Sequence, residues 1–117
     1  MYRTTFKFNN SKRTSSKDNY KHDSKFEASV ANDLLKKQKN GEIRSFISQK
    51  TLHFYVNGLH ICDYKVDFEV EHNDGSIEYI EAKGFETMLW IIKWRLLEAL
   101  HEEISPGSTI TVIKQQR

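Results

Sequence analysis

A carboxylate and an ammonium group lie two residues apart in the run YIEAKG at residues 79–84, as Glu81 and Lys83. Residues i and i+2 of a strand point to the same face, so both groups are expected side by side at a strand end. A second carboxylate, Asp67, stands fourteen residues earlier in the run VDF. Two carboxylates beside an amine could hold a divalent cation and act on a phosphate. Glu81 and Lys83 alone could equally be a surface ion pair of little energetic value.

The loop between the two strands predicts how the carboxylates are placed. In HNDGS at 72–76, a three-residue loop with Gly75 in the left-handed conformation is a common hairpin type. The resulting register puts Asp67 directly across from Glu81, although a two-residue loop would give a different register. Like charges placed opposite one another destabilise a sheet, so a bound cation, Mg²⁺ or Mn²⁺, is the natural explanation. On the other face, the register pairs Phe68 with Ile80 and Val66 with Ala82.

The surrounding segments predict an α+β fold. Ser24 followed by Glu27 is a capping-box pattern that starts a helix, and Gly41 ends it. Strand-like segments follow at 42–49, 51–56, 59–71 and 76–83, with a hairpin turn at 57–58. A second helix is expected over about 87–103, and a last strand at 108–114, which could pair in parallel. The expected order is α-β-β-β-α-β, a mixed sheet with helices packed against it.

Length and composition indicate one small intracellular domain. The 117 residues can bury a single core, and 29% charged residues suit a soluble chain. The one cysteine, Cys62, excludes an internal disulfide and fits a reducing, cytoplasmic setting. No signal peptide is visible, and the most apolar run, at 88–94, is too short to span a membrane. The five histidines show no metal-ligand spacing, and Trp90 and Trp94 have the spacing of core residues on a helix.

Charge is distributed unevenly along the chain. Residues 1–25 hold seven basic and two acidic side chains, which gives this stretch a charge of +5. Its polar composition without periodicity predicts a flexible basic arm over 1–23, followed by a folded domain over 24–117. Such an arm favours a polyanionic partner, and it could equally serve only as a solubility tail. The residues expected to contact DNA from this arm are Lys12, Arg13, Lys17 and Lys21.

The motif Val66-Asp67-Phe68 followed by Glu81-Ala82-Lys83-Gly84, with Glu27 on a preceding helix, resembles the PD-(D/E)XK nuclease superfamily. The order of elements is similar to that of its small phage-type members, the endonuclease I-type Holliday-junction resolvases and the transposon end-cleaving endonucleases. The resemblance covers about residues 24–114 and implies a restriction-endonuclease-like core. Val66 stands where the superfamily motif has proline. Gln49 matches a glutamine often found ahead of the aspartate in these enzymes.

The resemblance implies a role for each matching residue. Asp67 and Glu81 would bind the metal, with the Ala82 carbonyl as a further ligand, and Glu27 would complete or support the site. Lys83 would orient or activate the attacking water. Gln49 and Lys93 would contact DNA or line the site. The implied protein is a Mg²⁺- or Mn²⁺-dependent DNA endonuclease in phage or mobile-element DNA processing, acting on junctions or other branched DNA, in the host cytoplasm.

Other interpretations of these residues stay open. Asp67 could belong to the solvated face of an amphipathic strand, and Glu27 could be only the capping-box partner of Ser24. A nucleic-acid-binding protein that keeps the nuclease fold without cleavage is the main alternative function, and an αβ interaction module is a third. A resolvase that cuts two strands symmetrically would need a homodimer.

Overall fold

The computed structural model describes residues 13–14, 21–22 and 24–115. Within these ranges the helices and strands follow one another as β1 Arg13–Thr14, β2 Lys21–His22, α1 Lys25–Lys39, β3 Ser45–Val56, β4 Leu59–Glu71, β5 Ile77–Lys83, α2 Met88–Ile104 and β6 Thr109–Lys114. From α1 onward this is the expected α-β-β-β-α-β order, so the predicted α+β fold class is confirmed. Neither described helix is long and apolar enough to cross a membrane.

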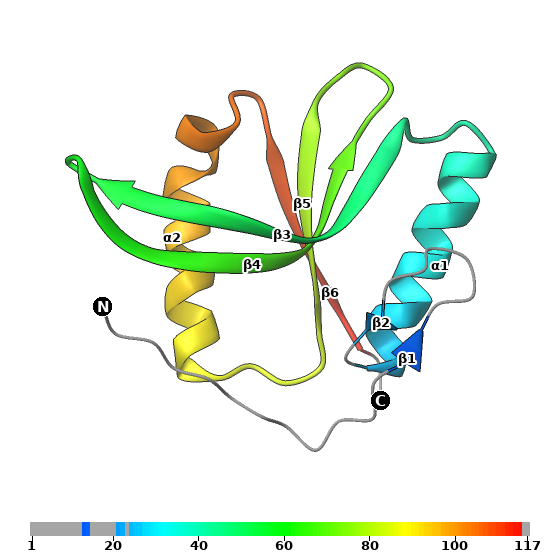
Figure 1. Ribbon diagram of the computed structural model, residues 1–117, viewed down its shortest axis with the longest axis horizontal. Helices are drawn as coiled ribbons and strands as arrows, with labels where there is room; N and C mark the ends of the chain where they lie inside the picture. The colour runs from blue at the N-terminus through cyan, green and yellow to red at the C-terminus, as the bar shows by residue number, and fades with distance from the viewer. Residues whose placement is uncertain (1–12, 15–20, 23, 116–117) are drawn as a thin grey trace.

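Four strands form one mixed sheet in the order β3-β4-β5-β6 (Figure 1). The pairs β3–β4 and β4–β5 are antiparallel, whereas β5 and β6 are parallel, as expected for a strand that follows a helix. The tight turns adopt the conformations that their sequences favour: Asn57 and Gly58 have φ of 52° and 82°, and Gly75 has φ of 88°. The predicted three-residue loop is also confirmed, because the His72 N–H donates to the Ser76 carbonyl.

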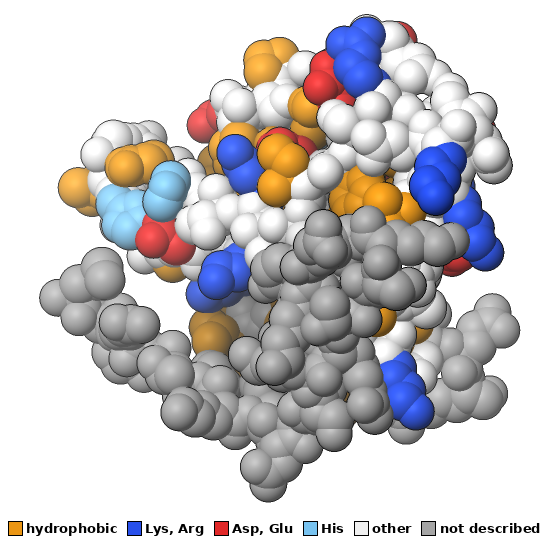
Figure 2. Space-filling view, turned by 45° about the vertical axis from the view of Figure 1, so that its right-hand side comes forward, with side chains coloured by type: hydrophobic (Ala, Val, Ile, Leu, Met, Phe, Trp, Pro, Cys, Tyr) orange, Lys and Arg blue, Asp and Glu red, His pale blue; other side chains and the backbone are white. Residues whose placement is uncertain are grey.

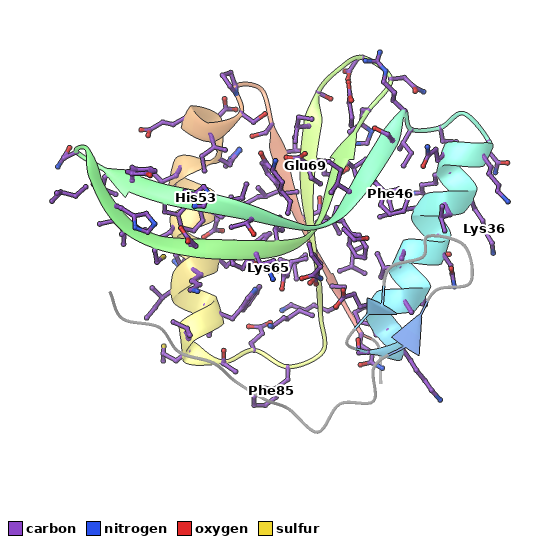
Figure 3. All side chains as sticks on the ribbon, viewed as in Figure 1. Lys36, Phe46, His53, Lys65, Glu69 and Phe85 are labelled. Carbon is purple, nitrogen blue, oxygen red and sulfur yellow. The ribbon has the colours of Figure 1, made fainter. Side chains whose placement is uncertain are left out.

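The two long helices cover opposite faces of the sheet (Figure 1). Tyr79 packs in a buried cluster with α2, and its neighbour Ile80 packs in a second cluster with α1. Successive side chains of a strand point to opposite faces, so β5 is sandwiched between the helices. Phe46 of β3 lies on the α1 side (Figure 3). The core is therefore divided in two, and β5 contributes side chains to both halves.

The β3–β4 hairpin bends sharply near Asp67, one of the residues of the predicted site. Phe68 pairs with Ile80 and packs near α1, but Val66, on the same side of β4 by alternation, packs with α2. The β3–β4 pairing is interrupted at Gln49 and Asp67, and Gln49 has a positive φ of 60°. The hairpin beyond this point swings away from β5 and over α2 (Figure 1). The expected pairing of Val66 with Ala82 is therefore wrong, because β4 and β5 diverge after the Phe68–Ile80 pair.

The predicted basic arm over 1–23 lies mostly outside the described residues. The exception is the short antiparallel pair formed by β1 and β2, which lies beside α1 (Figure 1). The sequence predicts no strand in this region. Lys12 and Lys17 fall outside the described residues, and only the backbone of Arg13 and Lys21 is described. The boundary near residue 24 coincides with the N-cap of α1, where the Ser24 hydroxyl accepts a hydrogen bond from the Glu27 N–H.

Candidate metal centre

Three carboxylates from three different elements come together where β4 and β5 diverge. Glu27 lies on the first turn of α1, Asp67 on β4 and Glu81 on β5. Their exposed fractions are 7%, 8% and 5%, in a chain whose other buried residues are almost all apolar. Carboxylates are rarely buried this deeply unless they are paired or bind a cation. The interpretation of Asp67 as a residue of a solvated strand face is therefore excluded.

Gln49 joins two of these carboxylates. Its side-chain Nε2 donates to Glu27 Oε2 at 2.7 Å and to Asp67 Oδ1 at 3.2 Å. The left-handed backbone at Gln49 is unusual for a residue with a side chain, and it lies at the break in the β3–β4 pairing. Strained residues of this kind are held in place by their surroundings and are concentrated at functional sites. Glu27 is therefore more than a helix-capping residue, since its carboxylate takes part in the cluster.

Side chains replace the missing backbone pairing between β4 and β5. Asp67 Oδ2 accepts a hydrogen bond from the Ala82 N–H at 2.9 Å. In return, the Asp67 N–H donates to Glu81 Oε1 at 3.4 Å. Each carboxylate is thus anchored to the opposite strand by one oxygen, and the pair is held together without being ladder partners. The expected pairing of Asp67 directly across from Glu81 is therefore wrong, although the two residues do lie in contact.

A second set of contacts fixes Glu81 and Lys83 from the α2 side. The Tyr64 hydroxyl donates to Glu81 Oε1 at 2.6 Å and accepts from Trp90 Nε1 at 3.0 Å. The Lys83 ammonium lies 4.0 Å from Glu81 Oε2 and 4.9 Å from the centre of the Trp90 ring. Trp90 therefore contacts both the group that orients Glu81 and the lysine of the motif. The Lys83 side chain is 20% exposed, so its charge lies at the margin between the cluster and solvent.

Burial and nearby negative charge disfavour the charged forms of Asp67 and Glu81. The pKa of Asp67 is raised to about 8, first by burial and then by the charges of Glu81 and Glu27. The pKa of Glu81 is also raised by burial, although the Tyr64 hydrogen bond and the Lys83 charge oppose the shift. Burial and the Glu81 charge raise the pKa of Tyr64, so its hydroxyl stays protonated and continues to donate. Asp67 and Glu81 therefore do not readily carry their charges together unless a cation compensates for them.

Some predicted site residues are not brought into the cluster. Lys93 is half-buried on α2 near Cys62. Burial raises the pKa of the Cys62 thiol, and the Lys93 charge opposes this shift in part. Ala82 contacts Asp67 through its N–H, and its carbonyl stays a predicted ligand only. The predicted contacts of Gln49 and of the arm with DNA are not tested by the structure.

Tyr64 and Trp90 are the contributors that the sequence analysis missed. Their patterns are typical of the apolar core, and both do pack there. A buried tyrosine hydroxyl and a buried indole N–H each need a hydrogen-bond partner, and this requirement is the signal that the sequence offers. The hydrogen bonds that join Tyr64 to Glu81 and to Trp90 depend on the divergence of β4 from β5 at Asp67, so the sequence does not identify these partners.

Comparison with known proteins gives a family but no activity. No curated protein and no solved structure matches the chain significantly. A family model described as "Protein of unknown function (DUF1064)" matches residues 5–116, which is nearly the whole chain. The chain therefore belongs to the DUF1064 family.

Proposed function

We propose that this protein is a divalent-metal-dependent DNA endonuclease of the PD-(D/E)XK type. The observation that carries the proposal is the convergence of Glu27, Asp67 and Glu81, all more than nine-tenths buried, with Lys83 beside them. A structural role does not account for three buried carboxylates, because apolar residues at these positions would fill the same space without the cost of burying charge.

The donor set fits Mg²⁺ or Mn²⁺. All three side chains offer oxygen, which these hard cations prefer. Asp67 and Glu81 would hold the ion, with Glu27 in support. The amide hydrogens of Gln49 occupy oxygens of Glu27 and Asp67, so this glutamine would yield those oxygens when an ion binds.

The chain's own residues suit hydrolysis of a phosphodiester. A bound divalent ion supplies a water of lowered pKa and neutralises charge on phosphate oxygens. The Ala82 N–H and the Tyr64 hydroxyl hold Asp67 and Glu81 in fixed orientations, which reduces the reorganisation that the site needs. Lys83 places a positive charge on the solvent side of Glu81, where a phosphate could approach.

DNA is the proposed substrate because of the resemblance and the basic stretch at 1–25. The competing function is a DNA-binding protein that keeps the fold but does not cleave. The mutual contacts of Asp67, Glu81 and Lys83 favour cleavage, because a protein that only binds DNA has no use for repelling carboxylates in its core.

The test is a Mg²⁺-dependent cleavage assay on supercoiled, linear, single-stranded, flapped and four-way-junction DNA. Asp67→Asn, Glu81→Gln and Lys83→Met should each lower the rate at least a hundredfold while DNA binding remains. The matched control is Glu71→Gln. Glu71 lies on β4, as Asp67 does, and its carboxylate forms an exposed ion pair with Arg44. Wild-type protein that binds DNA but leaves every substrate intact would favour the non-cleaving alternative. Equal loss in the control would mean that the effect is not specific to the cluster.

A further inference from the structure

The far end of the β3–β4 hairpin carries a second, separate group of potential metal ligands. His53 Nδ1 and His60 Nε2 each lie 2.7 Å from the same oxygen, Oδ1 of Asp63. One ligand atom from each residue lies within 4.8 Å of the others. The three side chains are 58%, 37% and 46% exposed, in the order His53, His60 and Asp63. Figure 2 shows histidine side chains gathered beside an acidic one at this end of the molecule.

A β-bulge brings the three residues to one face of the hairpin. His53 and Asp63 are ladder partners, and the register shifts by one residue between Phe54 and Tyr55. In a regular hairpin His60 would point away from Asp63, because residues three apart on a strand lie on opposite faces. The shift pairs His60 with Tyr55 instead, and so returns it to the face that carries His53. Bulges commonly re-aim a side chain in this way.

The shared face is confirmed by the aromatic contacts. The His60 ring centre lies 5.3 Å from that of Tyr55 and 6.4 Å from that of His53. Figure 3 shows His53 on the part of the hairpin that lies over α2, well away from α1. This group therefore does not belong to the carboxylate centre, and its chemistry is different.

Two imidazoles and one carboxylate are donors preferred by late first-row metals such as Zn²⁺. Metal–ligand bonds of about 2.0–2.2 Å place neighbouring ligand atoms roughly 3.0–3.5 Å apart in tetrahedral or octahedral geometry. The two nitrogens lie 2.7 Å from Asp63 Oδ1, so each needs to move away from it by about 0.3–0.8 Å. Exposure of all three side chains leaves room for water to complete the coordination sphere.

We propose that His53, His60 and Asp63 form a surface site for a late first-row transition-metal ion of the Zn²⁺ class. The ion links β3 to β4 across the bulge and so stabilises the end of the hairpin. This site does not depend on the proposed nuclease activity. It also differs from the carboxylate centre in selectivity, since imidazole ligands favour Zn²⁺ over Mg²⁺.

The experiment is calorimetric titration of the tag-free full chain with Zn²⁺, together with visible absorption of its Co²⁺ form. An Asp67→Asn background removes the proposed carboxylate centre from the measurement. We expect one equivalent to bind, and His53→Ala or His60→Ala to weaken binding at least tenfold. His72→Ala is the matched control, because His72 also contacts a carboxylate, Glu78 at 2.7 Å, but belongs to no group of three potential metal ligands among the described residues.

Unchanged affinity in His53→Ala and His60→Ala, or no saturable Zn²⁺ binding in the background protein, would overturn the proposal. Equal weakening by His72→Ala would also overturn it, since binding would then be distributed over surface histidines. The substituted side chains are exposed, and a circular-dichroism melt checks that each variant stays folded. A negative result here leaves the carboxylate centre unaffected, because Mg²⁺-dependent cleavage is measured separately in the wild-type protein.

Discussion

Replacing Asp67 by asparagine distinguishes a metal centre from a structural cluster. The substitution removes the ionisable group and keeps the size of the side chain. Its oxygen can still accept the hydrogen bond from the Ala82 N–H. Its amide group, however, would face the amide of Gln49, which donates to Asp67 in the wild-type protein.

The expected stability change follows from the raised pKa of Asp67. Unfolding lowers this pKa from about 8 to an ordinary value near 3.8. At pH 7 the folded protein must therefore hold a proton that the unfolded chain releases, at a cost of about 4 kcal/mol. The unfavourable contact with Gln49 offsets part of the gain. We expect the metal-free variant to be roughly 1–3 kcal/mol more stable than the wild type at pH 7, or several degrees in melting temperature.

The pH dependence has a defined sign. Between pH 4 and pH 8 the unfolded chain binds fewer protons at Asp67 than the folded protein does. This residue therefore makes the wild type less stable as pH rises through that interval, with no further loss above about pH 8. The difference in unfolding free energy between variant and wild type should grow over the same interval. Urea unfolding at pH 5, 7 and 9 without metal measures it.

Metal in large excess should reverse the order of stability. Mg²⁺ or Mn²⁺ adds about 1.4 kcal/mol to the wild type at ten times its dissociation constant and about 4 kcal/mol at a thousand times, which exceeds the expected advantage of the variant. The variant should show no such shift, and its cleavage should be lost. If metal-free Asp67→Asn is less stable than the wild type, the carboxylate serves the fold and the reasoning fails. An equal metal-induced shift in both proteins would place the ion elsewhere.

Three further outcomes are expected. Lys83→Met keeps an apolar side chain beside Trp90 but removes the charge. The metal-induced melting shift should therefore remain, while the cleavage rate falls at least a hundredfold. Equal loss of the melting shift and of cleavage would make Lys83 a structural residue. Tyr64→Phe removes the hydroxyl that Trp90 Nε1 and Glu81 share, which should lower the free energy of unfolding in urea by about 1–3 kcal/mol. Because this hydrogen bond lowers the pKa of Glu81, its loss should move the acidic limb of the cleavage pH profile to higher pH. An unmoved profile would remove Tyr64 from the site. Deleting residues 1–22 should weaken DNA binding and reduce the salt slope by about 0.9 for each lost phosphate contact; an unchanged slope would identify the segment as a solubility tail.

Local sequence patterns predict most of the fold. Ser24 begins α1, the turn at Asn57-Gly58 closes the first hairpin, and Gly75 sets the β4–β5 register as expected. Each of these features depends on residues close together in the chain, where capping and turn chemistry decide the conformation. The register set by Gly75 is also sufficient to predict that Asp67 and Glu81 lie close together.

Features that depend on long-range packing could not be predicted. The divergence of β4 from β5 follows from the bend at Gln49, and no local pattern marks a left-handed residue there. The partners of Tyr64 depend on where α2 places Trp90. The histidines show no metal-ligand spacing in the sequence, because the bulge that turns His60 toward Asp63 changes the face on which it lies.

The central claim is that the three buried carboxylates form a metal centre. It is tested most directly by an anomalous-difference map from crystals of the full chain soaked with Mn²⁺. We expect a peak bound by Asp67 and Glu81, near Glu27, that disappears in Asp67→Asn crystals. A map with no peak at these carboxylates, at a Mn²⁺ concentration that supports cleavage, would contradict the claim.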